Sequence, residues 1–168
     1  MIGILDKKLL QELEMYIRNH AITAVSAPYE IKETIDLEQS IDGVELEGFI
    51  KDKRKPTLHE VLFDFINRKG FTDSEVYKKA GIDRRHFSKI RSYHDYRISK
   101  NTAIALALAL ELTKKETDKL LRSAGFSLSE SDTHDLIIQF CIEKKLYNIH
   151  YVNQALDYFS LKPLTGLH

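Results

Sequence analysis

Apolar residues recur at spacings of three and four along most of the chain, which is the period of a helix with one buried face. Segments with this pattern lie at about 7–19, 57–70, 72–80, 84–92, 113–125, 129–145 and 148–162. One further apolar segment, 99–112, has a different pattern. Residues 103–112 alternate alanine with larger apolar residues. Alanine and leucine favour helices over strands, so we expect a central helix that is buried on several sides. The fold class is therefore predicted to be all-α.

Short polar motifs mark the predicted ends of these helices. Thr57, Thr72 and Thr113 each stand three residues before a glutamate. In this arrangement each of the two side chains binds a free backbone N–H at a helix start. Gly81 is expected to end the helix that begins at Thr72, because glycine readily adopts the left-handed conformation of a helix exit. Asp83 is expected to cap the next helix.

The N-terminal third follows a different pattern. Asp6 is predicted to cap a first helix, after which residues 21–55 mix short apolar pieces with acidic residues and glycines. We predict that this stretch is irregular or linker-like, with room for one short strand or helical turn. The chain divides into an N-terminal helix with an acidic irregular region (1–55), a helical domain (56–126) and a C-terminal helical extension packed on it (127–168).

The charge distribution changes this picture more than the overall composition does. The sequence holds 25 Lys and Arg against 25 Asp and Glu, so its formal net charge is zero. However, residues 1–50 hold four basic and ten acidic residues, whereas residues 68–100 hold ten basic and four acidic ones. A strongly basic segment is typical of proteins that bind nucleic acid.

Catalysis, metal binding and membrane insertion find little support in the sequence. The single cysteine, Cys141, lies in an apolar run and is expected in the core, where neither a disulfide nor a thiolate cluster can form. The histidines follow no metal-ligand spacing, and no phosphate loop or nucleophile motif is present. We expect a non-enzymatic protein without catalytic, cofactor or metal sites. No run reaches the ~18 apolar residues of a membrane span, so a cytoplasmic location without membrane contact is predicted.

The segment from Thr72 to Ile90 resembles the helix-turn-helix core of the λ-repressor/Cro (XRE-like) regulators. The matching positions are Thr72, Val76, Ala80, Gly81, Ile82, Phe87 and Ile90. Residues 57–70 and 99–126 resemble the flanking helices of that family, so the likeness covers about residues 57–126. It implies a λ-repressor-like helix-turn-helix bundle, here with additional C-terminal helices and a less regular N-terminal region.

The resemblance also implies a function, that of a DNA-binding transcriptional regulator whose third helix enters the major groove. Carried over by position, the DNA-binding residues are Arg84, Arg85, Ser88, Lys89, Arg91, Arg97 and Lys100. The first four are expected at base edges or phosphates, and the last three at outlying phosphates. The implied partner is double-stranded DNA, and the implied assembly is a homodimer.

Two alternatives stay open at this point. A non-catalytic protein-interaction adaptor or antitoxin-like module would use the same fold, with a protein partner on the acidic N-terminal region or the C-terminal helices. Asp73 and Asp83, which add carboxylates beside the basic residues, and the zero net charge favour it. In a second arrangement, acidic residues 30–47 fold over the basic face and block it.

The environment of three ring side chains, those of Tyr93, His94 and Tyr96, is also open. They either stack on bases or form a partly buried loop cluster.

Overall fold

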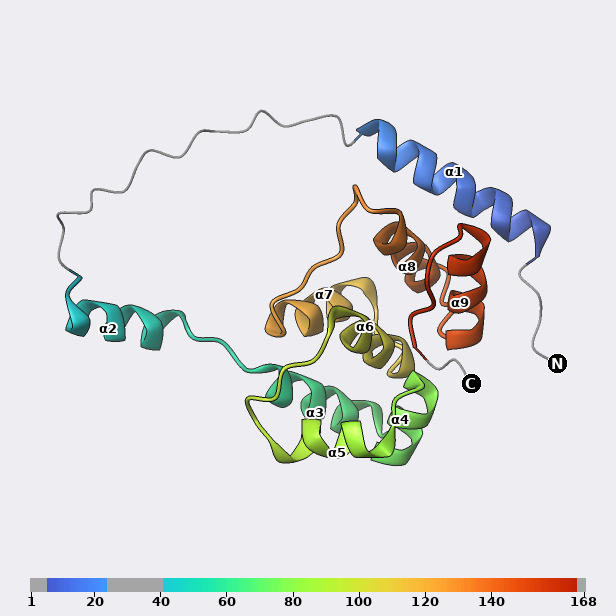
Figure 1. Ribbon diagram of the computed structural model, residues 1–168. Helices are drawn as coiled ribbons and strands as arrows, with labels where there is room; N and C mark the ends of the chain where they lie inside the picture. Colours follow the sequence, from blue (N-terminus) through green and yellow to red (C-terminus); the bar gives the residue numbers. More distant parts are fainter. Residues whose placement is uncertain (1–5, 24–40, 166–168) are drawn as a thin grey trace.

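The computed structural model describes the backbone of residues 6–23 and 41–165, and the side chains of all of these except 21–23. Every regular element in these two stretches is a helix, which confirms the all-α class (Figure 1). The helices are α1 (Lys7–Thr23), α2 (Gly43–Lys53), α3 (Leu58–Lys69), α4 (Asp73–Ala80), α5 (Arg84–Ser92), α6 (Lys100–Ala109), α7 (Lys114–Ser123), α8 (Thr133–Glu143) and α9 (Ile149–Tyr158).

Helix α6 lies at the centre of the packed helices. Its residues from Thr102 to Ala109 are all buried, and α4, α7 and α9 pack against it. The alanines let these neighbours approach closely, while each buried leucine contributes about 2 kcal/mol relative to an exposed one. The prediction of a central helix surrounded on several sides is confirmed, and the alternation of alanine and leucine in the sequence reflects burial all round, not a strand.

Most of the predicted helix ends are confirmed. Thr72 and Thr113 form complete capping boxes with the glutamates three residues on, whereas Thr57 caps α3 by accepting a hydrogen bond from Glu60 N, and the reciprocal bond is not formed. Helix α8 differs from the prediction. The apolar pattern predicts a start near residue 129, but Asp132 is the cap and accepts a hydrogen bond from His134 N at 2.8 Å.

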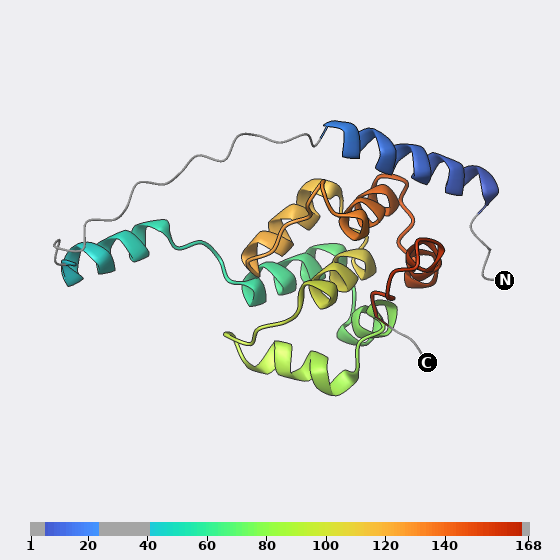
Figure 2. The same ribbon diagram turned by 45° about the horizontal axis from the view of Figure 1, so that its top comes forward.

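The C-terminal helices pack on the rest of the chain. Helix α8 packs against α7 and α9, and α9 packs against α6 (Figures 1 and 2). Beyond α9, the Thr165 hydroxyl donates a hydrogen bond to the backbone oxygen of Ala80, which ties the end of the described chain to α4. Helix α1 lies along α8, buries Leu13 and forms a Glu12–Lys144 ion pair of 2.8 Å.

Helix α2 is the main departure from the predicted elements. Residues 43–53, which we expected to be irregular, form a helix capped by Asp42. None of its residues is buried, and in both views it stands clear of the other helices (Figures 1 and 2). Residues 24–40 lie outside the described residues. They include most of the acidic stretch 30–47, which one alternative places over the basic face.

Candidate nucleic-acid interface

The turn that joins α4 to α5 sets the direction of α5. Gly81 ends α4 with a φ of 66°, in the left-handed region, and Ile82 N donates to Tyr77 O at 2.9 Å. Asp83 then caps α5 by accepting a hydrogen bond from Arg85 N at 2.6 Å. This capping role accounts for one of the two carboxylates beside the basic residues, because a negative side chain at a helix N-terminus is stabilising.

Helix α5 has one buried side and one exposed side. Phe87 and Ile90, each 2% exposed, anchor it to the core. Ser88 and the side chains of Arg84, Arg85 and Lys89 are exposed, and α5 runs along the outside of the packed helices (Figures 1 and 2). Across residues 6–23 and 41–165, none of these three cations has an ion pair or a side-chain hydrogen bond. Their charge is therefore available to a partner.

Arg91, the next candidate along α5, is engaged within the protein. Its Nε and Nη2 donate to the Asp73 carboxylate at 2.5 and 2.7 Å, and its guanidinium lies 4.2 Å from the centre of the Phe63 ring. The hydrogen bond to Asp73 raises the pKa of Arg91. Arg91 thus links α3, α4 and α5. It also compensates the negative charge of Asp73, which is the other carboxylate beside the basic residues, after Asp83.

Lys100, at the start of α6, is also engaged. Its Nζ lies 2.6 Å from the carboxylate of Asp135, which is 1% exposed and also accepts a hydrogen bond from Ser129 N at 2.8 Å. Burial alone raises the pKa of Asp135, but the hydrogen bonds from His134, Lys100 and Ser129 outweigh burial and hold that pKa at about 2. Lys100 therefore joins α6 to the start of α8 and is withdrawn from the candidate phosphate contacts.

Arg97 lies in the loop between α5 and α6 and is exposed. It lines an open groove of about 650 Å³ whose other walls are residues 55–58, 94–98 and 123–126. Lys55 and Asp95 also line this groove. Lys55 is distant in sequence from Arg97 and is not among the DNA-binding residues predicted from the sequence. The groove lies beside the loop that follows α5 and borders the start of α3.

The aromatic residues of this loop have different environments. Tyr93 is 60% exposed, whereas Tyr96 is partly buried and its ring lies edge-on to His86. The His94 ring lies 4.1 Å from that of His59, which in turn donates from Nε2 to Arg91 O at 2.9 Å. Tyr96 thus belongs to a partly buried cluster, one of the two arrangements considered for this loop, while the exposed Tyr93 ring is free to stack. No pattern in the sequence indicates the contact of His59 with the end of α5.

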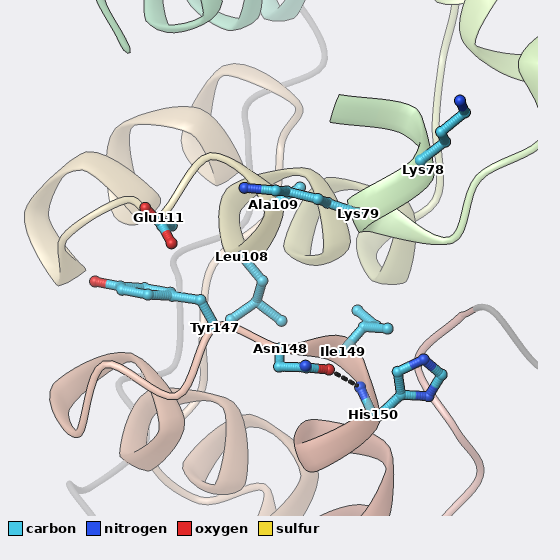
Figure 3. Close-up of a pocket in the computed structure, with 9 residues that line it drawn as sticks. All are labelled: Lys78, Lys79, Leu108, Ala109, Glu111, Tyr147, Asn148, Ile149 and His150. Carbon is cyan, nitrogen blue, oxygen red and sulfur yellow. Dashed lines mark hydrogen bonds between the residues drawn. The ribbon is translucent and has the colours of Figure 1, made fainter. Parts of the chain in front are cut away.

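A smaller pocket of about 360 Å³ lies between α4, the end of α6 and the start of α9 (Figure 3). In Figure 3, Lys79 reaches across the pocket toward Glu111, whereas Lys78 points away from it. The polar group of Asn148 is occupied in capping α9, since it accepts from His150 N at 2.9 Å. No residue of α5 lines this pocket, and its lining shows no arrangement that selects a ligand.

The described residues do not support a metal site, a reactive cysteine or a membrane span. No group of three His, Cys, Asp or Glu residues is placed to hold a metal ion within 6–23 and 41–165. Cys141 is buried in α8, and burial raises the pKa of its thiol to about 12. None of the described helices combines the length and the apolar character that a membrane span requires.

Comparison of the chain with protein-family models, with curated proteins and with solved structures gives no significant match.

Proposed function

We propose that residues 57–126 form a λ-repressor-like helix-turn-helix domain and that α5 binds double-stranded DNA, as in a transcriptional regulator. The observation that carries the proposal is the outer face of α5. Arg84, Arg85 and Lys89 are exposed there without a carboxylate partner in the described part of the chain. Arginine and lysine on an exposed helix contact phosphates and the acceptor atoms of guanine.

The order and lengths of the helices support the same proposal. Helices α4 and α5 are short and are joined by a tight turn at Gly81. Helix α4 packs against α6, and the Phe87 ring of α5 contacts the Phe63 ring of α3. This leaves α5 on the outside of the domain, where a helix about 10–12 Å wide can enter a major groove about 12 Å wide. In this arrangement Arg84 and Arg85, at the start of α5, meet base edges or phosphates, with Ser88 and Lys89 one turn later.

The two carboxylates beside the basic residues, which favour the adaptor alternative, both have partners within the protein. The carboxylate of Asp73 is compensated by Arg91, and that of Asp83 caps α5. Neither is an isolated negative charge beside the basic face. The proposed set of DNA contacts is accordingly Arg84, Arg85, Ser88, Lys89 and Arg97, with Lys55 added from the groove.

The test is a charge reversal on α5. Arg84→Glu/Arg85→Glu/Lys89→Glu is expected to lower affinity for double-stranded DNA by at least about 100-fold at moderate salt. The slope of log affinity against log salt concentration should fall by roughly 3, because fewer counterions are released on binding. Fluorescence anisotropy with labelled duplexes over a salt series measures both quantities.

The chain offers a matched control for this variant. Lys7, Lys8 and Arg18 are three exposed cations of α1, which lies away from α5 (Figures 1 and 2). Lys7→Glu/Lys8→Glu/Arg18→Glu therefore changes the net charge by the same amount. We expect this control variant to retain most of the affinity for DNA. Equal losses in the two variants would show that binding follows net charge alone and does not involve α5.

A protein-interaction adaptor remains the second candidate, because α2 exposes several large apolar side chains. If this is the main function, the intact protein fails to bind DNA even at low salt, and the α5 reversal leaves binding to its protein partner unchanged.

A further inference from the structure

Large exposed apolar residues are concentrated on and just before α2. Of the eight such residues in the described part of the chain, five lie between positions 41 and 50. They are Ile41, Val44, Leu46, Phe49 and Ile50, with exposed fractions from 44% to 82%. Single exposed apolar residues are ordinary, but a group of them on one short element marks an interaction surface.

Helix α2 is nevertheless well formed at both ends. Asp42 accepts a hydrogen bond from Val44 N at 3.0 Å, Glu45 lies in the first turn, and Lys51 and Lys53 lie in the last. Each of these features stabilises a helix locally. However, an isolated helix of 11 residues is marginal in water. Burial of its apolar side against another molecule would add the packing energy that it lacks within one chain.

The positions that share one side of α2 follow a self-complementary order. Leu46, Phe49 and Ile50 are separated by three and four residues, and the same spacing places Asp42 before them and Lys53 after them on that side. The side is therefore acidic at one end, apolar in the middle and basic at the other end. Val44 lies on the opposite side and Ile41 precedes the helix, so neither is included in this surface.

The charge of the whole segment repeats this order. Residues 41–48 hold three acidic and no basic residues, whereas residues 49–55 hold four basic residues and one acidic residue. Two such helices side by side in the same direction would place like charges together. In opposite directions, Asp42 of each copy meets Lys53 of the other, and Leu46 meets Phe49. We propose that α2 is a self-association helix, which pairs antiparallel with α2 of a second copy of this chain.

The expected dimer is weak and depends on concentration, because a helix of this length spans only about 16 Å and buries a small area. The pairing does not rest on DNA binding, since α2 and α5 have no residue in common. It is therefore measured on the protein alone, and its failure would leave the proposed function of α5 untouched.

The first experiment is analytical ultracentrifugation of the full chain over a range of concentrations up to about 1 mM, where even a weak complex is populated. We expect a monomer–dimer equilibrium that Phe49→Glu weakens at least tenfold. Helix content should be retained, because Phe49 supports no buried contact. The control is Met15→Glu, which places the same charge on a residue of α1 that is 62% exposed and should leave the dimer intact. A wild-type protein that stays monomeric, or a dimer that Phe49→Glu does not weaken, would overturn the proposal.

A charge exchange tests the antiparallel direction. Glu45→Lys/Glu47→Lys makes both halves of α2 basic, and Lys51→Glu/Lys53→Glu makes both halves acidic. Each variant alone is expected to dimerise at least tenfold more weakly than the wild type, and an equimolar mixture of the two is expected to form a heterodimer. If each variant alone associates as tightly as the wild type, or if the mixture shows no heterodimer, the antiparallel pairing is wrong.

Discussion

Asp73 and Arg91 form an exposed ion pair that determines which charges are available beside α5. Their side chains are 36% and 50% exposed, so the pair contributes less than about 1 kcal/mol to stability. Its effect on the surface is larger, because it removes one cation and one anion from the region where a phosphate backbone would lie. The contact of Arg91 with the Phe63 ring further fixes the guanidinium.

Asp73→Asn is predicted to strengthen DNA binding. The substitution removes the carboxylate and releases Arg91 toward the DNA, so affinity should rise by up to about tenfold, or about 1.4 kcal/mol. The effect should shrink at high salt. The control is Asp64→Asn, which releases Arg68 from an exposed pair on α3 and should leave affinity unchanged. Anisotropy titrations that show no gain for Asp73→Asn would show that the ion pair does not withhold Arg91 from DNA.

The buried carboxylate of Asp135 predicts a dependence of stability on pH. Its pKa is about 2 in the folded protein, below the value of about 3.9 for an unfolded aspartate. The ionised form therefore stabilises the fold above about pH 4, and this contribution is lost as the pH falls toward 2. Asp135→Asn should lower the free energy of unfolding by roughly 2 kcal/mol at pH 7.

Urea unfolding at several pH values measures this contribution. The difference in unfolding free energy between the wild type and Asp135→Asn should narrow between about pH 4 and pH 2. A difference that stays constant over this range would show that the charge of Asp135 contributes nothing and that the substitution acts through packing alone.

Among the elements, the turn between α4 and α5 is the one that the proposed function most depends on. Gly81→Ala is predicted to lower the free energy of unfolding by about 1 kcal/mol, because an alanine is strained at a φ of 66°. The control is Gly48→Ala in α2, where an added Cβ meets nothing within 4 Å and alanine is the better helix former. Chemical denaturation of both variants is the measurement, and equal stability of the wild type and Gly81→Ala would contradict the role of this turn.

The elements that could be predicted from sequence are those with local signals. Thr72, Gly81 and Asp83 act within a few residues of their own positions, so their roles follow from spacing alone. Helix α2 was missed because its apolar stretch is short and contains Gly43 and Gly48, and glycine disfavours a helix. Its stability comes from its cap and its terminal charges, which are weak signals beside two glycines.

The candidate site was predictable only in part, because some of its contacts join residues that are distant in sequence. The exposed position of Arg84, Arg85 and Lys89 follows from the helical period when Phe87 and Ile90 face the core, as they do in the structure. The partners of Arg91 and Lys100 lie 18 and 35 residues away. Such contacts depend on how helices pack, which no local pattern contains.

At the scale of the whole molecule, the exposed basic side of α5 and the exposed apolar side of α2 lie on different elements, and neither is needed to complete the core. A zero net charge is compatible with DNA binding here, because the charges are unevenly placed: exposed cations gather on α5 and in the adjoining groove. Local charge, not net charge, governs such an interface.

The most direct test of DNA recognition by α5 is selection of bound fragments from random double-stranded DNA at physiological salt. The wild-type protein is predicted to enrich a shared sequence, and Arg84→Glu/Arg85→Glu/Lys89→Glu is predicted to enrich none while it keeps the wild-type helix content. If the wild type enriches no sequence, or if the triple variant enriches the same sequence, then α5 does not read DNA.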